Sequence, residues 1–229
     1  MKKFTFLFMM MIFSYFGFSQ ATDLIISEYI EGSSNNKAVE IYNGTGNPVD
    51  LSNYEIWRVS NGGTWPEATI PLTGTLADGD VYVVYNPSSV AGISSVGDLS
   101  SSNVSWNGDD AVGLAKDMGG TMTLIDAVGE DGPDPGSGWD VAGTTNGTLD
   151  HTIVRKVDVC SPNTDWASSA GTNTSDSEWI VYNIDDFSFL GSHSSTCAGG
   201  NIPPFVANVM TLPTMDITSS DAVSVSADI

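Results

Sequence analysis

Acidic side chains gather in a loop whose composition could serve to bind a cation. Residues 130–136 read Glu-Asp-Gly-Pro-Asp-Pro-Gly, and Asp131 and Asp134 are its candidate ligands. Carboxylate and carbonyl oxygens are the donors that Ca²⁺ prefers, so Ca²⁺ is the one cofactor that the sequence suggests. The loop lacks the spacing of an EF-hand, and a solvated acidic loop without metal is the alternative. Asp109 and Asp110 form a second acidic group, directly after an Asn-Gly turn.

Two glutamates, Glu28 and Glu40, fall on neighbouring expected strands. A pair of carboxyl groups facing each other is the arrangement with which glycosidases perform acid and base catalysis. Strand positions at a protein surface also carry Glu for solubility alone, and this structural reading is the one we favour.

The two histidines, His151 and His193, are 42 positions apart. Histidine metal sites gather their ligands at short spacing, which this pair lacks. The sequence also has no Gly-x-Ser-x-Gly nucleophile motif, although a Ser-His-Asp triad can form from scattered residues. We therefore expect surface or capping roles for both histidines, no catalytic residue, and no enzyme activity in this segment.

Three tryptophans, Trp65, Trp106 and Trp139, lie in or beside expected loops. An exposed indole can stack on a sugar or a base, so these three are the candidates for ligand contact. Tryptophan is amphipathic and often half-buried, which leaves core packing as the alternative. Trp57 and Trp179 lie in expected strands, where packing is the prediction.

The two cysteines, Cys160 and Cys197, are separated by 37 positions. An even number of cysteines in an exported chain favours a disulfide bond, whereas a reducing compartment would leave two free thiols. A disulfide here would tie the end of the domain back to its body.

Short runs of β-branched and aromatic residues, separated by Gly, Pro, Asn and Asp, fill most of the chain. This pattern predicts an all-β sandwich or barrel, since no run of ten residues shows uninterrupted helical periodicity. The expected strands are Leu24–Ile30, Ala38–Tyr42, Tyr54–Val59, Val81–Tyr85, Ala111–Ala115, Thr121–Val128, Thr152–Lys156 and Glu178–Tyr182. The run Val81–Tyr85 is nearly continuous apolar, so we expect it to be buried on both faces.

Residues 1–19 have the form of a secretory signal peptide, with two lysines before an apolar run that is too short to span a membrane. Its removal would leave 210 residues with a net charge of −23, compared with −21 for all 229 residues. We expect a protein that is secreted or held at the cell surface of a bacterium, with no transmembrane segment. So negative a chain is a poor ligand for nucleic acid, whose phosphates require Lys and Arg.

The sequence changes character after residue 198. Residues 199–204, Gly-Gly-Asn-Ile-Pro-Pro, have the composition of a linker that follows a domain at 20–198. Residues 205–229 contain two expected strands, too few for a stable domain, and we read them as the incomplete start of a second domain of Ig or Fn3 type. An unstructured tail is the alternative.

Several segments resemble the lamin tail domains of bacterial proteins. They are, in order, Leu24–Tyr29, Val39–Asn43, Val49–Tyr54, Leu76–Val83, Trp106–Leu114 and Leu124–Gly129. The resemblance extends from residue 23 to about residue 193, and it implies an immunoglobulin-like β-sandwich of lamin-tail type. Its motifs are structural, so it assigns no catalytic residue.

The resemblance also implies a context, because such domains often accompany extracellular nucleases or phosphatase-like hydrolases. The expected function is therefore that of a secreted, non-catalytic accessory module in a larger extracellular hydrolase, whose partner is a catalytic or surface domain further along the chain. A cell-surface adhesion or carbohydrate-binding module with a glycan ligand is the alternative.

Overall fold

The computed structural model describes residues 20–197. The expected signal peptide at 1–19, the linker at 199–204 and the second domain at 205–229 lie outside the described residues. Within them, no helix is long and apolar enough to cross a membrane.

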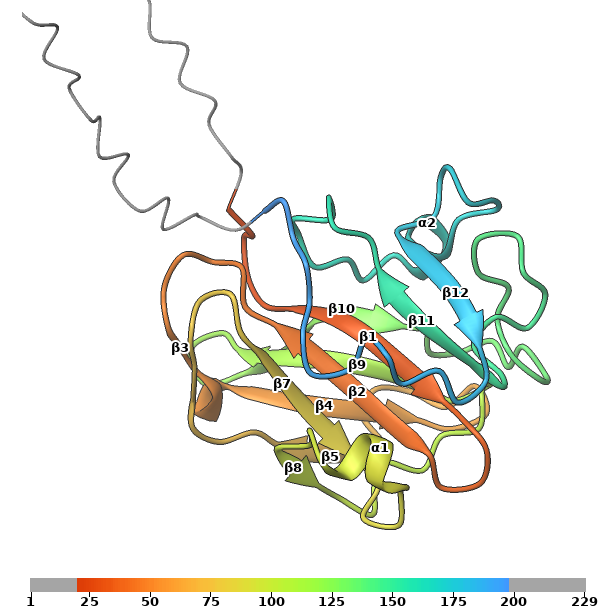
Figure 1. The fold of residues 1–229 in the computed structure, drawn as a ribbon, viewed down its shortest axis with the longest axis horizontal. Coiled ribbons are helices and arrows are strands. Elements are labelled where there is room, and N and C mark those ends of the chain that lie inside the picture. The colour runs from red at the N-terminus through yellow and green to blue at the C-terminus, as the bar shows by residue number, and fades with distance from the viewer. Residues whose placement is uncertain (1–19, 198–229) are drawn as a thin grey trace, which may run out of the picture.

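The described residues form two facing sheets, which confirms the immunoglobulin-like, all-β fold (Figure 1). The large sheet has six strands in the order β12-β11-β1-β2-β7-β8, and only the β7–β8 pair is parallel. Its strands are β1 (Ile25–Glu31), β2 (Lys37–Tyr42), β7 (Val81–Tyr85), β8 (Leu99–Ser100), β11 (His151–Arg155) and β12 (Trp179–Asn183). The small sheet has four strands in the order β10-β9-β4-β5, namely β4 (Tyr54–Val59), β5 (Ala68–Pro71), β9 (Ala111–Asp117) and β10 (Met122–Val128).

Short elements connect the strands of the two sheets. β3 (Val49–Asp50) and β6 (Thr75–Leu76) pair with each other, and β3 leads into the 3₁₀ turn η1 (Leu51–Asn53). The helices α1 (Ala91–Ser94) and α2 (Trp166–Ala170) are each about one turn long. The eight strands expected within these residues are present, two with the expected bounds and six with an end shifted by at most two residues, whereas the sequence does not predict β3, β5, β6 and β8. Two to four residues are too few to show an alternation of apolar and polar side chains.

The main core lies between the two sheets. Ile26 and Tyr29 of β1 lie in the same buried cluster as Ile56 of β4 and Leu114 of β9. Burying each of these side chains completely contributes about 1.5–3 kcal/mol, so this layer holds the sheets together.

A smaller apolar cluster covers the outer face of the large sheet, the face that turns away from the small sheet. Ile30, Ala38 and Val83 of this face pack with Ile93 of α1 and with Leu190. The centre of the large sheet is therefore buried on both sides, and Val83 and Val84 at the middle of β7 fall into opposite clusters, as expected for this run.

Turns form where the sequence predicts them. Gly79 and Gly108 take φ values of 80° and 98°, a region that side chains with a Cβ rarely adopt. Asp50 accepts a hydrogen bond from the backbone N–H of Ser52 at 3.0 Å and so begins η1.

Candidate functional site

Glu28 and Glu40 face each other on the outer face of the large sheet. They are register partners across β1 and β2, next to a bulge between Ile26 and Glu28. Only 1% of Glu28 and 0% of Glu40 is exposed to solvent. The structure thus brings the two carboxyl groups together, but it places them inside the protein rather than at its surface.

A segment that follows β12 covers this pair. Residues 184–197, here called the closing segment, cross the outer face of the large sheet and return toward the end at which residue 20 lies (Figure 1). The N–H of Gly191 in this segment donates to Oε2 of Glu40 at 2.7 Å, and Ser27 Oγ donates to its Oε1 at 2.7 Å. Both oxygens of Glu40 are therefore engaged with the fold.

Burial changes the protonation of both glutamates. It raises the pKa of Glu28 to about 9, with further contributions from the charges of Glu40 and Asp186. It raises the pKa of Glu40 to about 7, against the hydrogen bonds from Ser27 and Gly191, which lower it. Neither oxygen of Glu28 has a hydrogen-bond partner. At neutral pH Glu28 is therefore an uncharged acid enclosed by the fold.

His193 lies in the closing segment, with its ring edge-on to that of Tyr42 at 4.9 Å between centroids. Burial lowers the pKa of His193 to about 4, and the charge of Arg155 lowers it further. The imidazole is therefore neutral at physiological pH. It lines a cavity of about 300 Å³ between the closing segment and strands β11 and β12, together with Val154 and Tyr182.

His151 is the first residue of β11, and Arg155 is the last. Its Nδ1 contacts the carbonyl oxygen of Leu149 at 2.6 Å, so this nitrogen is bonded to backbone. This contact is of the capping kind expected from the sequence.

The disulfide between Cys160 and Cys197 is present, which confirms the pairing expected for an exported chain. It fastens the end of the closing segment to the loop after β11. The carbonyl of Cys160 also accepts a hydrogen bond from the N–H of Thr22 at 3.1 Å. The first and last described residues of the domain therefore lie at the same end of the sandwich.

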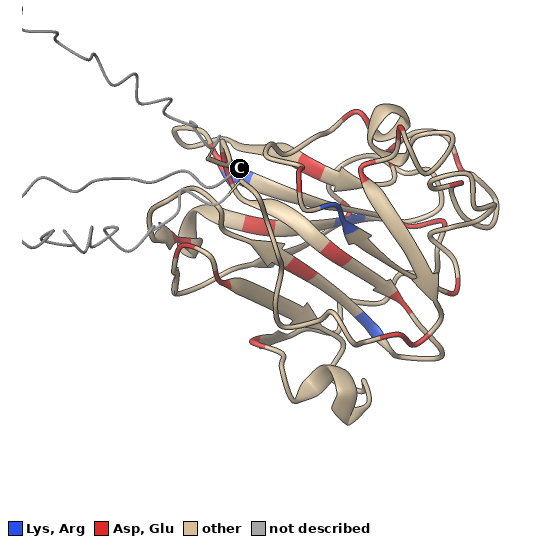
Figure 2. Ribbon diagram, turned by 45° about the horizontal axis from the view of Figure 1, so that its top comes forward, with Lys and Arg blue, Asp and Glu red and all other residues tan. Residues whose placement is uncertain are grey.

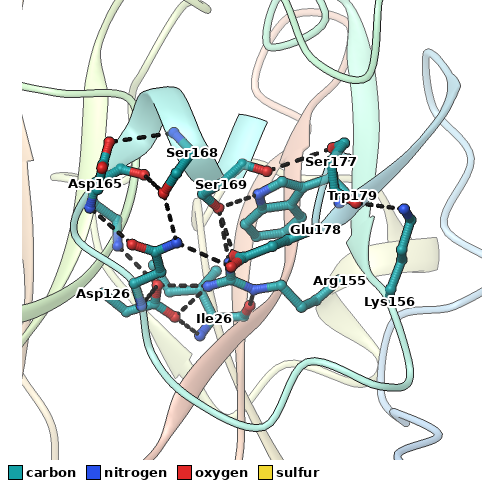
Figure 3. A network of polar contacts seen from close by, with 12 residues as sticks. Ile26, Asp126, Arg155, Lys156, Asp165, Ser168, Ser169, Ser177, Glu178 and Trp179 are labelled. Atoms are coloured by element: carbon teal, nitrogen blue, oxygen red, sulfur yellow. Dashed lines mark hydrogen bonds and ion pairs between the residues drawn. The ribbon is translucent and has the colours of Figure 1, made fainter. Parts of the chain in front are cut away.

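Arg155 is the centre of a buried polar network that the sequence did not reveal (Figure 3). It is 1% exposed, and its Nη2 donates to both carboxylate oxygens of Asp126 at 2.5 Å. Its Nε donates to the carbonyl of Ile26 at 3.1 Å, and its Nη1 donates to Ser169 and Glu178. The guanidinium also stacks on the ring of Trp179, 4.2 Å from its centroid.

The carboxylate of Asp126 is equally well satisfied. Besides Arg155, it accepts hydrogen bonds from the N–H groups of Ile26 at 2.7 Å and of Asn163 at 3.0 Å. A buried ion pair persists only when its remaining donors and acceptors find such partners. This network therefore holds the two sheets together and is built for stability rather than for ligand contact. One signal could have revealed it, namely the presence of Asp126 and Arg155 inside otherwise apolar expected strands.

Trp106 is not a surface residue, which corrects the expectation that it contacts a ligand. Its side chain is 0% exposed, its Nε1 donates to the carbonyl of Ile30 at 2.9 Å, and its ring stacks on Tyr29. The loop position suggested exposure, but the segment containing Trp106 inserts the indole between the sheets.

Trp65 and Trp139 each keep part of the side chain at the surface. Trp65 lies beside Trp57, with ring centroids 6.5 Å apart, and Trp139 lies edge-on to Trp166 at 6.4 Å. The structure does not bring these two into contact with each other. Trp57 and Trp179 are packed into the fold as expected.

Asp131 and Asp134 are both exposed in the loop between β10 and β11. Asp134 accepts a hydrogen bond from the N–H of Gly136 at 2.7 Å, which shapes the loop itself. Among residues 20–197, no three His, Cys, Asp or Glu side chains come together in a way that could hold a metal ion. Asp110 is instead paired with Arg58 at 3.6 Å.

Comparison with known proteins identifies the family of the domain. The model of the Lamin Tail Domain family matches residues 18–131, which include strands β1 to β10 and all the motifs on which the resemblance rests. A search of curated proteins and a search of solved structures found no match. Strands β11 and β12 lie beyond the matched residues but complete the same large sheet, because β11 pairs with β1. From the order of its motifs, its two-sheet fold and the family match, the chain belongs to the lamin tail domain family.

Proposed function

We propose that this chain is a secreted, non-catalytic accessory module that acts beside a hydrolase of nuclease or phosphatase type. The observation that carries the proposal is the burial of Glu28 and Glu40, the two carboxyl groups best placed for acid and base chemistry. Water and substrate would have to displace the closing segment to reach them. Both side chains are buried, and Glu40 bonds β2 to Ser27 and to the closing segment.

The position of the chain ends supports the role of an attached module. Thr22 is bonded to Cys160, which is joined to Cys197, so the rest of the protein connects to the domain at one end. The disulfide suits an oxidising environment outside the cell.

The negative net charge of the chain argues against direct binding of nucleic acid. Apart from Lys2 and Lys3, the chain has five basic side chains, and acidic positions predominate on the strands and loops (Figure 2). A nuclease partner would therefore have to supply the contacts to phosphate itself.

The test is an activity assay on the purified chain with DNA, RNA, p-nitrophenyl phosphate and p-nitrophenyl glycosides. The proposal predicts no turnover above the rate without protein. Turnover that disappears in both E28Q and E40Q would show instead that the buried pair is catalytic. The control is E130Q, which changes an exposed glutamate in the same way.

A glycan-binding role is the second candidate, and the partial exposure of Trp65 and Trp139 favours it. Binding on a glycan array that is lost in W65A or W139A would support this role. Trp139 also packs on Trp166, so W139A is informative only if its far-ultraviolet circular dichroism matches that of the wild type.

A further inference from the structure

Strand β12 forms an open edge of the large sheet that lacks the usual protection. It pairs with β11 along all five residues without a bulge, and no strand within residues 20–197 pairs with its other side. The other edges in the described part of the chain are protected. β8 has only two residues, β5 ends at Pro71, and β10 contains a bulge between Leu124 and Asp126. Unprotected edges invite the addition of a further strand, and proteins keep them where such addition is useful.

The hydrogen-bonding groups of this edge can be assigned from the register. The N–H of Lys156 donates to the carbonyl of Glu178, so these two residues form a hydrogen-bonded pair of the ladder. By alternation, Ile180 and Tyr182 also turn their backbone groups toward β11, whereas Val181 turns its N–H and its carbonyl toward the open edge. An added strand could therefore form hydrogen bonds with both the N–H and the carbonyl of Val181.

A cavity with both apolar and polar lining residues lies directly beside this edge. Ile180 and Tyr182 project to the outer face of the sheet, where they line the cavity of about 300 Å³ with Val154, Phe189 and His193. Ile180 is 43% exposed, although it is a large apolar residue. Side chains of a strand alternate between the two faces, so every second residue of an added strand would lie beside Ile180 and this cavity.

Charge defines the rest of the partner. Asp185 and Asp186 closely follow β12. Glu178, directly before β12, is already paired with Arg155. Every basic side chain of residues 20–197 is already bonded within the domain. These pairs are Lys37 with Glu31, Arg58 with Asp110, Lys116 with Asp23, Arg155 with Asp126, and Lys156 with the carbonyls of Thr174 and Ser177. A strand with a basic residue at the end beside Asp185 and Asp186 would complement this edge, whereas a second copy of this acidic chain would be repelled.

We propose that β12 is a docking edge for an extended segment of a partner protein that adds to the large sheet as a further strand. The segment carries apolar side chains at alternate positions, which cover Ile180 and the cavity, and Lys or Arg at the end that lies beside Asp185 and Asp186. This inference names the kind of partner for the module proposed above, and it rests on that module being a binding domain.

The test measures binding of the full chain to the peptide Lys-Thr-Val-Thr-Val-Thr-Lys by isothermal titration calorimetry. V181P removes the edge N–H, and I180K places a charge beside the cavity, so each is expected to weaken binding about tenfold or more. M118K is the matched control, because Met118 is equally an exposed apolar residue, at 62%, but lies in the turn between β9 and β10. It is expected to leave binding unchanged. Since V181P could disturb folding, I180K provides the independent variant.

Three results would overturn the proposal. The first is no binding of the peptide by the wild type at about 1 mM, the weak end of specific association. The second is that I180K and V181P bind the peptide as tightly as the wild type does, or that a peptide N-methylated at alternate amides binds as tightly as the unmodified peptide. The third is a dimer of the chain that I180K dissociates, since the edge would then serve a second copy. Hydrolase activity together with edge-dependent peptide binding would refute only the accessory role, and inactivity without peptide binding would refute only the docking edge.

Discussion

Arg155 and Asp126 join the two sheets of the sandwich through a fully buried ion pair, in which Nη2 of Arg155 donates to both carboxylate oxygens of Asp126. Arg155 belongs to β11 of the large sheet and Asp126 to β10 of the small sheet, and both side chains are 0% exposed. The backbone of Ile26 is bonded to both partners, so β1 is fixed at the same point. The pair therefore sets how the sheets are positioned relative to each other.

Removing both partners of this pair is expected to cost less stability than the two single removals added together. R155M leaves the carboxylate of Asp126 buried without its counter-charge, and we expect a loss of about 3–5 kcal/mol in the free energy of unfolding. The double variant R155M/D126L is expected to lose less than the sum of the two single variants. Urea unfolding followed by tryptophan fluorescence measures all three. Additive losses would contradict the assignment of a coupled pair.

The disulfide between Cys160 and Cys197 is expected to hold the closing segment in place. The double variant C160S/C197S should lose about 3–4 kcal/mol of stability, the amount expected for a closed loop of this size. It should also expose Glu40 to water, because Gly191 of the closing segment donates to that side chain. Hydrogen exchange at Gly191, compared with an amide of the small sheet such as that of Leu114, measures the second effect. Unchanged protection at Gly191 would show that the segment stays closed by packing alone.

Trp106 is expected to behave as a core residue. W106A should destabilise the chain by about 3–5 kcal/mol, because it leaves a cavity in the core and removes the hydrogen bond to the carbonyl of Ile30. W65A, which removes a partly exposed indole, serves as the comparison and should cost clearly less. Thermal unfolding measures the stability that each variant loses relative to the wild type. Equal losses in W106A and W65A would be inconsistent with the buried position of Trp106.

The sequence was sufficient to predict the fold class and eight of the strands. Runs such as Tyr54–Val59 alternate over enough residues to be recognised, and turns such as that at Gly79 need a residue that tolerates positive φ. The strand pair of β3 and β6 depends instead on contacts between distant parts of the chain. Such short strands gain their stability from tertiary packing, which leaves no local signal.

The site was harder to predict, for a physical reason that Glu28 and Trp106 illustrate. The local surroundings of both residues predict a surface position, since one is on a strand and the other is beside a loop. Glu28 is covered by the closing segment and Trp106 is inserted between the sheets. Burial of either residue depends on segments far away in the sequence, so local pattern could not reveal it. The disulfide was predictable because only two cysteines were available to pair.

The raised pKa values of the two buried carboxyl groups predict how the free energy of unfolding changes with pH. Glu28 keeps its proton in the folded chain up to about pH 9, whereas the ordinary pKa of a glutamate is 4.5. Between these values the folded state binds more protons than the unfolded state, so the free energy of unfolding falls as pH rises. Glu40 acts in the same direction up to about pH 7. His193, with its pKa lowered to about 4, acts in the opposite direction and only below its ordinary value of 6.5.

The most direct test of this account is the free energy of unfolding of the wild type, E28Q and E130Q from about pH 5 to about pH 9. The wild type and E130Q are expected to lose stability with rising pH, by an amount on the order of a few kcal/mol. E28Q should lose markedly less, because glutamine stays uncharged under the closing segment. If the curves of the wild type and E28Q ran parallel, Glu28 would be ionised and solvated in the folded chain. The central claim, that this pair is enclosed by the fold, would then be wrong.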